Sequence, residues 1–417
     1  MTTTMDVAST WTVGEPRLLA GVGDLGRVDL GHHRALHGEP VARSLDWLVR
    51  ATHDVNLLGR GGAAFPVTRK LQAMSGRAGA HVLVNGSEGE PASHKDRALM
   101  TGAPHLVLDG ALVVAHALGA TAVTIVVHDA RAHASLLGAV RERPDAAGVS
   151  VVHTHDGFVG GEVRAVINRL NLGVARPGGR RDLPHLHGIG GRATFASNVE
   201  TFAQIALLAG MGVAEYARTG APDEPGTSLV TLIGDVAAPG VVEVPHGTPL
   251  QVLLPGRRDA PVLVGGYHGT WVRDADRLDL TRADTRQPGG LRGAGVIARP
   301  FADTCVLAEV AAVSRWLAGE SVGQCGPCFF GLPALADDME SFADGTGSRV
   351  RAHRRLSEVR GRGACAHPDG AVEFMSSALA TLADDIDVHR HRGGACGRPA
   401  STILPLPSAL TSPRRAR

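Results

Sequence analysis

The sequence predicts a multidomain α/β protein, and three changes of pattern along the chain carry that prediction. Short apolar runs alternate with helical periodicity over residues 55–217, which indicates strands and helices layered around a largely parallel sheet. From Gly220 onward, short strands are separated by Gly and Pro turns, and after Pro300 the apolar residues keep one-face helical spacing. A chain of 417 residues is too long to form a single hydrophobic core of ordinary size, so several domains are expected.

The same patterns place the individual elements. In the first region we expect strands at 81–85, 122–127 and 149–154, and helices at 106–118, 132–143, 163–170 and 199–217. Further strands are expected at 229–233, 241–244 and 261–264, with a helical turn after Thr248. Val306, Val310, Val313 and Leu317 share one helix face, and another amphipathic helix is expected at 370–387. The resulting units are an N-terminal segment (1–54), an α/β domain (55–220), a β-rich module (221–295), a helical bundle (296–388) and an irregular tail (389–417).

Bulk composition excludes several classes of protein. A net charge of +1 gives no electrostatic basis for nucleic-acid binding. Apolar runs are interrupted well before 18 residues, so no transmembrane helix is expected, and residues 1–12 lack the pattern of a signal peptide. We therefore expect a cytoplasmic protein. Five cysteines, an odd number, favour metal binding or free thiols over a disulfide framework.

Lysine is nearly absent from the chain. Of the 42 lysine and arginine residues only Lys70 and Lys95 are lysine, and both lie in glycine-rich motifs. Lysine and arginine are not interchangeable where geometry is tight, because one carries a compact ammonium and the other a planar guanidinium. The two placements therefore predict a phosphate-bearing ligand.

The first glycine-rich motif is Gly59-Arg60-Gly61-Gly62-Ala63-Ala64-Phe65-Pro66, which leads to Lys70. Its unobstructed backbone amides suit a phosphate or a flat ring system. Phe65 offers a stacking face, and Arg60 and Lys70 offer positive charge. A tight glycine turn before a helix has the same pattern, so the motif alone leaves both interpretations open.

The second motif runs from Asn85 through Ser87, Glu88 and Glu90 to Lys95 and directly follows a predicted strand. Ligands of α/β sheets bind at that end of a strand, and an asparagine can both donate to and accept from the edge of a heterocycle. The alternative is an exposed loop whose charges pair with one another.

A third motif, Gly157-Phe158-Val159-Gly160-Gly161-Glu162, opens a predicted helix. Such a turn suits an anion, while a glutamate there would accept hydrogen bonds from ribose hydroxyls. Asn198 and Thr201, at the start of the next helix, are interpreted either as helix caps or as ligand contacts.

Three of the cysteines have the spacing of metal ligands. Cys325-Gly326-Pro327-Cys328 is followed by Cys365, with His367 two positions later. This spacing suits an iron–sulfur cluster or zinc. Cys305 begins an apolar helix face and is interpreted as a buried structural thiol.

Taken in order, these motifs resemble the NADH-binding flavoprotein subunit of respiratory complex I and its relatives in diaphorase and formate dehydrogenase complexes. The resemblance also includes Asn198-Val199-Glu200-Thr201 and Glu320-Ser321-Val322-Gly323-Gln324-Cys325, and it runs from about residue 15 to residue 387. It implies an oxidoreductase with a Rossmann-like FMN domain, a β-grasp (SLBB) module and a helical bundle that carries a 4Fe–4S cluster. In such a protein the cofactors carry the electrons, so no catalytic side chain is required.

The resemblance also implies which residues contact the cofactors. The FMN contacts would be Gly59, Arg60, Gly61, Gly62, Lys70, Asn85, Glu88, Gly161, Glu162, Asn198 and Thr201. Phe65 and Glu90 would border the nicotinamide side, and Cys325, Cys328 and Cys365 would bind the cluster.

The sequence departs from the family pattern at both cofactor sites. Val322 replaces the first cluster cysteine, and valine cannot bind iron. On the NADH side the chain has Ser87 in place of an aspartate, Val163 in place of a glutamate and Leu183 in place of a phenylalanine. The position of Leu183 follows from aligning residues 180–184 with the corresponding run of the family. Losing a ribose carboxylate and an aromatic stack could each cost about 1–3 kcal/mol, or together about two to four decades of affinity. NAD(H) is therefore expected as an inherited but weakened donor.

Cys396 is the candidate for the missing cluster ligand. A helix over 370–387 would end about 27 Å from Cys365, at roughly 1.5 Å per residue. The nine residues 388–396, at about 3.3 Å each, could span that distance back.

Our leading hypothesis is a flavin and iron–sulfur oxidoreductase subunit that exchanges electrons with a ferredoxin-like or other redox subunit. The complex that they form can be peripheral to a membrane. Two alternatives stay open. One is a non-catalytic scaffold that has lost its cofactors. The other is a flavoprotein in which Cys325, Cys328 and Cys365 hold zinc together with His367 or Cys396.

Overall fold

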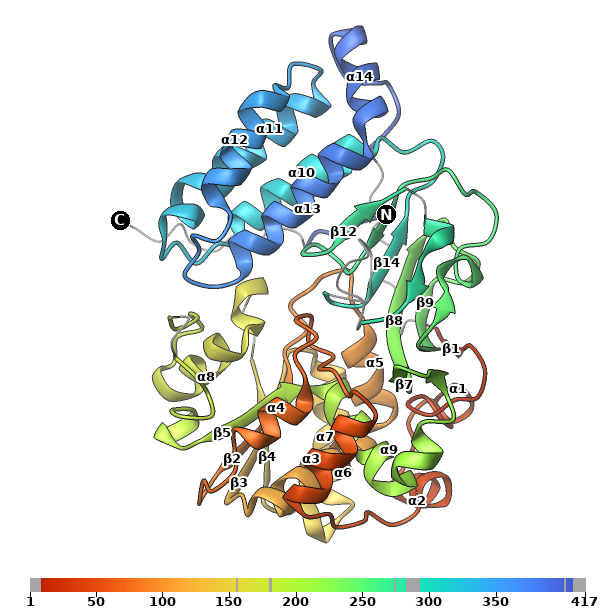
Figure 1. Cartoon of the computed structure of the whole chain (residues 1–417), viewed down its shortest axis with the longest axis vertical. Helices are drawn as coiled ribbons and strands as arrows, with labels where there is room; N and C mark the ends of the chain where they lie inside the picture. Colours follow the sequence, from red (N-terminus) through yellow and green to blue (C-terminus); the bar gives the residue numbers. More distant parts are fainter. Residues whose placement is uncertain are drawn as a thin grey trace.

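The computed structural model describes residues 9–154, 157–179, 182–273, 275–282, 293–400 and 403–407. Figure 1 shows an α/β part around strands β2–β5 at one end of the molecule, a helical bundle at the other end, and a second sheet alongside them. The predicted combination of a Rossmann-like parallel core with a helical C-terminal region is confirmed.

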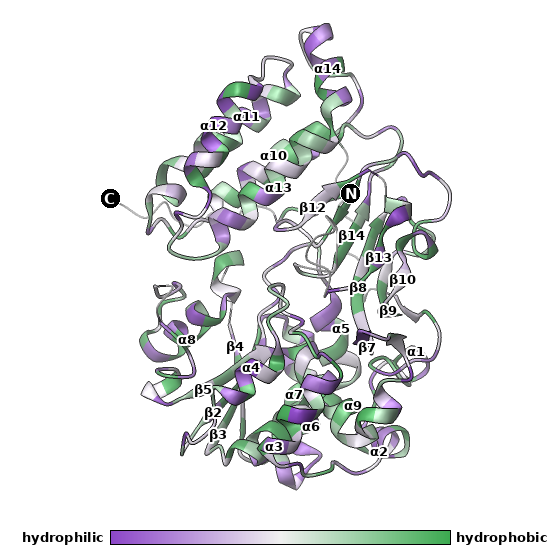
Figure 2. Cartoon of the chain, in the orientation of Figure 1, coloured by the Kyte–Doolittle hydropathy of each residue, from purple (hydrophilic) through white to green (hydrophobic). Residues whose placement is uncertain are grey.

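A four-stranded parallel sheet forms the centre of the α/β part. Its strands are β2 (His81–Gly86), β3 (Ala122–Val127), β4 (Val149–His153) and β5 (Thr194–Asn198), in the order β4-β3-β2-β5. The three predicted strands are confirmed to within one residue, whereas β5 was not predicted. Successive side chains of a strand point to opposite faces, and both faces are covered: Val82 and Val84 belong to one core cluster, and Leu83 to another. Hydrophobic residues accordingly run along these strands in Figure 2.

Helices cover both faces of this sheet. The helices up to residue 216, of which α1 and α2 do not contact this sheet directly, are α1 (Val22–Leu25), α2 (Leu30–His37), α3 (Leu45–Asp54), α4 (Val67–Gln72), α5 (Lys95–Gly102), α6 (Pro104–Leu118), α7 (Ala130–Arg141), α8 (Val163–Leu172) and α9 (Val199–Tyr216). The helices predicted at 106–118, 132–143, 163–170 and 199–217 are confirmed with ends shifted by at most two residues. Residues of α8 pack with Leu83 on one face. On the other face, α6 and α9 meet so closely that a Cβ atom on Gly110 would lie 1.9 Å from the carbonyl oxygen of Phe202.

The second sheet is mixed and has six strands. In spatial order they are β1 (Thr10–Thr12), β9 (Gly240–Pro245), β8 (Thr227–Gly234), β14 (Val296–Arg299), β11 (Val262–Val264) and β12 (Thr270–Val272). Two short pairs accompany it: β6 (Gly220–Ala221) with β7 (Glu224–Pro225), and β10 (Thr248–Pro249) with β13 (Asp279–Leu280). The predicted strands at 229–233, 241–244 and 261–264 are confirmed, and the expected helical turn is the 3-10 turn Leu250–Val252. Because β1 pairs in parallel with β9, the N-terminal segment is part of this sheet.

The helical bundle contains α10 (Val306–Gly319), α11 (Leu332–Ala343), α12 (Arg349–Val359), α13 (His367–Thr381) and α14 (Ala383–Arg392). The single helix predicted at 370–387 is therefore wrong: it divides at Leu382 into α13 and α14, and α14 continues to Arg392. The described residues after α14 are irregular, so the irregular tail begins four residues later than the predicted 389, and it packs on the bundle, with Cys396 and Leu404 buried.

No single helix in the described ranges is both long and apolar enough to cross a membrane. One pair of helices, α5 and α6, reaches the required length and hydropathy only when taken together across a 93° bend.

Candidate functional site

The topological switch point of the parallel sheet lies between β2 and β5. The chain moves from β2 outward to β3 and β4 and then returns to place β5 on the other side of β2. Open α/β sheets bind ligands at the carboxyl ends of the two strands where the order reverses. Asn85 and Asn198 are register partners at these two ends.

The first glycine-rich motif is fastened to this switch point. The backbone N–H of Arg60 donates to Thr201 Oγ1 at 2.9 Å, which ties the motif to the start of α9. A Cβ atom on Gly61 would lie 3.2 Å from Asn198 Cβ, so the backbone passes close to β5. Gly62 has a left-handed φ of 95° and forms a bridge with Gly293.

The third motif meets the second at the same place. Asn85 Nδ2 donates to the carbonyl oxygen of Gly161 at 2.8 Å. A Cβ atom on Gly161 would lie 2.9 Å from the backbone oxygen of Ser87, so only glycine fits. Three motifs that are distant in sequence therefore converge at the carboxyl ends of β2 and β5.

Lys70 places a cation beside β5 without a carboxylate partner. Its Nζ donates to the carbonyl oxygen of Ala196 at 3.0 Å and contacts Ser197 Oγ at 3.5 Å. No carboxylate of a described residue lies within 4.0 Å of Nζ, and burial lowers the pKa of Lys70 to about 8. A partly buried cation without a counter-charge is unfavourable, so an anionic ligand would compensate it.

Ser87 offers a second unsatisfied polar group at the switch point. Its Oγ is buried and has no hydrogen-bond partner among the described residues. Buried hydroxyls are normally hydrogen-bonded, so this atom indicates a missing partner. The Lys70 ammonium, the Ser87 hydroxyl and the close glycine backbone together fit a phosphate-bearing flavin such as FMN.

The carboxylates of Glu88 and Glu162 are already engaged by the protein. Glu88 accepts hydrogen bonds from the backbone N–H groups of Asp96 and Arg97 at 3.1 and 3.0 Å, and from Ser93 Oγ. Glu162 caps α8 and pairs with Arg164 Nε at 2.9 Å. Both residues brace the loops of the site, and their contact with a ligand stays a prediction.

Arg60 and Lys95 belong to a buried ionic cluster that was not predicted. The Lys95 ammonium lies 2.7 Å from Asp96 Oδ1 and 3.0 Å from Glu200 Oε2. The Arg60 guanidinium lies 3.7 Å from Glu200 Oε1 and 3.8 Å from Glu224 Oε1. Carboxylates therefore already surround both cations, and the contact of Arg60 with a phosphate-bearing ligand stays a prediction.

Arg282 completes this cluster. Its backbone N–H donates to Glu224 Oε2 at 2.7 Å and its side chain is fully buried. Burial lowers the pKa of Arg282 to about 10, while burial also raises the pKa of Asp96 to about 6. Glu200 lies inside the Asn-Val-Glu-Thr motif, which was the one signal in the sequence that could have revealed the cluster.

The two residues predicted to border the nicotinamide side differ in exposure. Phe65 is 46% exposed, so its ring is available for stacking. Glu90 is buried: Oε2 accepts a hydrogen bond from the backbone N–H of Tyr267 at 2.9 Å, and Oε1 has no partner among the described residues. Burial raises the pKa of Glu90 to about 8. The contact of either residue with a nucleotide stays a prediction.

Cys325, Cys328 and Cys365 form the second site, at the end of the bundle that faces α8. The thiols of Cys325 and Cys328 interact directly, and Cys365 is close enough to act on Cys328 electrostatically. Burial raises the pKa of Cys328 to about 11, and it also raises that of Cys365. Three clustered thiols are ligands of the type that iron–sulfur clusters use.

Cys396 does not join these three cysteines. It lies with Cys305 and His389 near the start of α10. The predicted return path fails because α14 continues to Arg392, which leaves four residues, about 13 Å of extended chain, before Cys396. Burial raises the pKa of Cys396, but hydrogen bonds from Arg398 and other neighbours outweigh burial and lower the pKa to about 6.

His367 does not point a free nitrogen at the cysteines. Its Nε2 donates to the carbonyl oxygen of Leu317 at 2.9 Å, and its Nδ1 lies 3.0 Å from His268 Nε2. The alternative of a zinc ion held by Cys325, Cys328, Cys365 and either His367 or Cys396 therefore lacks a fourth ligand from either candidate.

The comparison with protein families agrees with both sites. Residues 52–207 match the family model described as the Nuo51 FMN-binding domain, and residues 308–389 match the one described as the NADH-ubiquinone oxidoreductase-F iron-sulfur binding region. In both regions the chain resembles the family of F-type NADH-quinone oxidoreductase subunits. The first match contains all three glycine-rich motifs, and the second contains Cys325, Cys328 and Cys365.

Individual members of this family align with most of the chain. The F-type NADH-quinone oxidoreductase subunit of Escherichia coli is 29% identical over 395 residues, which cover 86% of this chain and 89% of that protein. A second such protein, the F 2 subunit of Rhizobium meliloti, is 27% identical over 383 residues, covering 84% and 90%. The crystal structure of an air-oxidized NAD+-reducing [NiFe]-hydrogenase superposes with a TM-score of 0.78 at 27% identity, over 92% of this chain and 68% of the hydrogenase chain.

Proposed function

We propose that this F-type protein moves electrons between FMN at the switch point and an iron–sulfur cluster at Cys325, Cys328 and Cys365. The observation that carries the proposal is the loop 157–162, which contacts the switch point and lies near Cys365. Its Gly161 accepts the hydrogen bond from Asn85, and its Glu162 lies close enough to Cys365 to act on that thiol electrostatically. When bound, FMN would supply a two-electron acceptor for hydride and a one-electron donor to a cluster.

The residues of the chain position the two sites relative to each other. Glu320, at the end of α10, accepts a hydrogen bond from the backbone N–H of Phe158 at 2.7 Å. Gln324 Nε2 donates to the carbonyl oxygen of Pro177 at 3.0 Å. These contacts hold the cysteine loop against the α/β part and so fix the position of one site relative to the other.

NADH is the proposed donor, with weakened affinity. Leu183, where the family has a phenylalanine, is 41% exposed and offers no aromatic ring to a base. Of the aligned segment 180–184, Arg180 and Arg181 lie outside the described residues. Ser87 replaces an acidic residue at the switch point, so the negatively charged carboxylate that could accept a hydrogen bond is absent there.

The acceptor is proposed to be another redox subunit of a cytoplasmic complex, either soluble or peripheral to a membrane. Cys328 is followed by Phe329 and Phe330, which are 63% and 76% exposed. Large exposed aromatic side chains beside a redox site are typical of a surface that another protein covers.

An anaerobic visible spectrum before and after addition of NADH tests the proposal. We expect absorption from both flavin and cluster, which decreases at millimolar NADH. A colourless protein that releases no flavin on denaturation would instead support the alternative of a scaffold without cofactors. Bleaching by dithionite but not by NADH would retain the electron-transfer role and remove NADH as the donor.

A further inference from the structure

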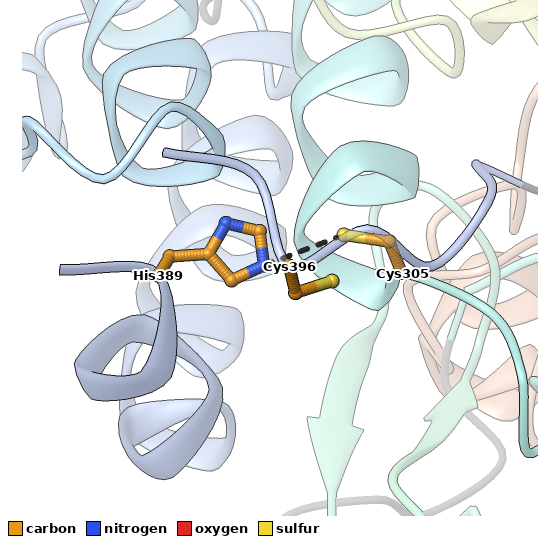
Figure 3. Close-up of side chains that lie close together, drawn as sticks. All are labelled: Cys305, His389 and Cys396. Carbon is orange, nitrogen blue, oxygen red and sulfur yellow. Dashed lines mark hydrogen bonds between the residues drawn. The ribbon is translucent and has the colours of Figure 1, made fainter. Parts of the chain in front are cut away.

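A cluster of three metal-ligating side chains lies apart from both proposed cofactor sites. Cys305 precedes α10, His389 is on α14, and Cys396 lies in the tail, as Figure 3 shows. One ligand atom from each residue lies within 4.8 Å of the other two, and all three residues are buried. Within the described residues this is the one group of three such side chains that are this close.

The ring of His389 is fixed in the form that can bind a metal. Its Nδ1 donates to the carbonyl oxygen of Ala343 at 2.6 Å, so Nε2 keeps its lone pair and faces Cys305. Metal-binding histidines commonly have this arrangement, in which a backbone carbonyl accepts from the nitrogen that does not bind the metal.

The spacing of the ligand atoms matches a tetrahedral zinc ion. Cys305 Sγ lies 3.6 Å from His389 Nε2. In a tetrahedral site with Zn–S of about 2.3 Å and Zn–N of about 2.0–2.1 Å, this separation is about 3.6 Å. The sulfur of Cys305 and the nitrogen of His389 are thus already spaced for a single ion, and Cys396 lies within 4.8 Å of both.

Charge around Cys396 also favours a metal ligand. Arg398 Nε donates to Cys396 Sγ at 3.4 Å, and the same guanidinium pairs with Asp385 Oδ1 at 2.7 Å. A cation that donates to the sulfur stabilises the thiolate, which is the form of cysteine that binds zinc.

We propose that Cys305, His389 and Cys396 bind one zinc ion, with a water molecule as the fourth ligand. Binding would release the thiol protons that remain on the two cysteines. The ion would fix the tail to the bundle, where Cys305 N already donates to the carbonyl oxygen of Pro399 at 2.9 Å. The fixed tail leads to Leu404, which is buried, and to Pro405, whose carbonyl accepts from the Tyr267 hydroxyl at 2.7 Å.

Zinc, iron and acid-labile sulfide measured on the full-length protein, purified anaerobically with reductant, test this assignment. We expect one zinc per chain, and at least a fivefold loss of zinc in Cys396→Ala with iron and sulfide unchanged. Cys325→Ala is the matched control and should lose iron while retaining zinc. His389→Asn provides a second variant, since an asparagine amide can still donate to Ala343 O while lacking the metal-binding nitrogen.

Extended X-ray absorption fine structure at the zinc edge reports the ligands of zinc without interference from iron. We expect two sulfur ligands at about 2.3 Å and one nitrogen at about 2.0–2.1 Å. The assignment is overturned if wild-type protein supplied with zinc retains none after dialysis, if iron and not zinc falls in Cys396→Ala, or if mass spectrometry finds a Cys305–Cys396 disulfide under the same reducing conditions.

Discussion

Asn85 and Asn198 stand opposite each other at the carboxyl ends of the neighbouring parallel strands β2 and β5. Asn85 holds the loop that carries Gly161, at 2.8 Å from its carbonyl oxygen, and Asn198 bonds to Asp96 Oδ2 at 2.6 Å. The pair therefore joins the three glycine-rich motifs at one edge of the sheet. Changes at this edge should affect flavin binding more than they affect the rest of the fold.

Gly161→Ala should weaken FMN binding. The added methyl group would lie 2.9 Å from the backbone oxygen of Ser87, so the loop must shift. Overpacking of this kind costs about 1–3 kcal/mol, which corresponds to roughly a 5- to 150-fold rise in the FMN dissociation constant if the loop forms the site. Gly148→Ala is the control, because a Cβ atom at Gly148 meets nothing within 4 Å. Equal FMN affinities for both variants would argue against a flavin at this edge.

Lys95→Met should destabilise the protein, unlike Lys70→Met. Lys95 is buried between Asp96 and Glu200, and removing one partner of a buried ion pair costs about 3–5 kcal/mol. In flavin-free protein the thermal midpoint should fall by roughly 3–6 °C, because a chain of 417 residues loses about 1 °C per kcal/mol. Lys70→Met should leave the midpoint unchanged or raise it, because the partly buried Lys70 ammonium has no carboxylate among the described residues to leave unpaired. Similar midpoints for the two variants would contradict these different roles.

Glu90→Gln should remove a pH dependence of stability. Burial raises the pKa of Glu90 from 4.5 to about 8, so the folded protein keeps its proton over a range where the unfolded chain has lost it. The folded state binds more protons there, and stability therefore falls as pH rises from about 4.5 to 8, by roughly 5 kcal/mol at most. Thermal midpoints from pH 5 to pH 8 should decline less steeply for the variant than for wild type. Parallel pH profiles would show that Glu90 is ionised in the folded protein.

Val322→Cys should strengthen the iron–sulfur site. The family has a cysteine here, and this half-buried valine follows Ser321, whose hydroxyl interacts with the Cys328 thiol. We expect iron per chain to rise toward four and the cluster absorbance to decay more slowly in air. Val350→Cys, at a valine that is 83% exposed on α12, should change neither. No difference between the two variants would place the cluster away from residue 322.

Local sequence patterns were sufficient for the elements that frame the site. The apolar runs at β2, β3 and β4 and the periodicity of α6, α7 and α9 gave their ends to within two residues. Strand β5 was not predicted, because Thr194–Asn198 is short, polar at both ends and continuous with α9. The second glycine-rich motif follows β2 directly, and this position pointed to a ligand at that edge of the sheet.

Long-range pairing could not be predicted from local patterns. Arg60 and Lys95 point inward because the carboxylates of Glu200 and Glu224 meet them from distant parts of the chain. Cys305 resembled an isolated core thiol because its neighbour His389 lies 84 residues away. The break at Leu382, which redirects α14 and the tail, has no proline or glycine to mark it.

The most direct test of the flavin site compares FMN with riboflavin, which lacks the phosphate. Lys70→Gln should raise the dissociation constant of FMN by roughly 10- to 100-fold, the loss of a charged hydrogen bond, and should change that of riboflavin less than about twofold. Arg69→Gln, which removes an exposed cation next to Lys70 on α4, is the control and should change neither. If Lys70→Gln weakens FMN and riboflavin equally, or weakens neither, Lys70 does not face the phosphate and the proposed binding site is wrong.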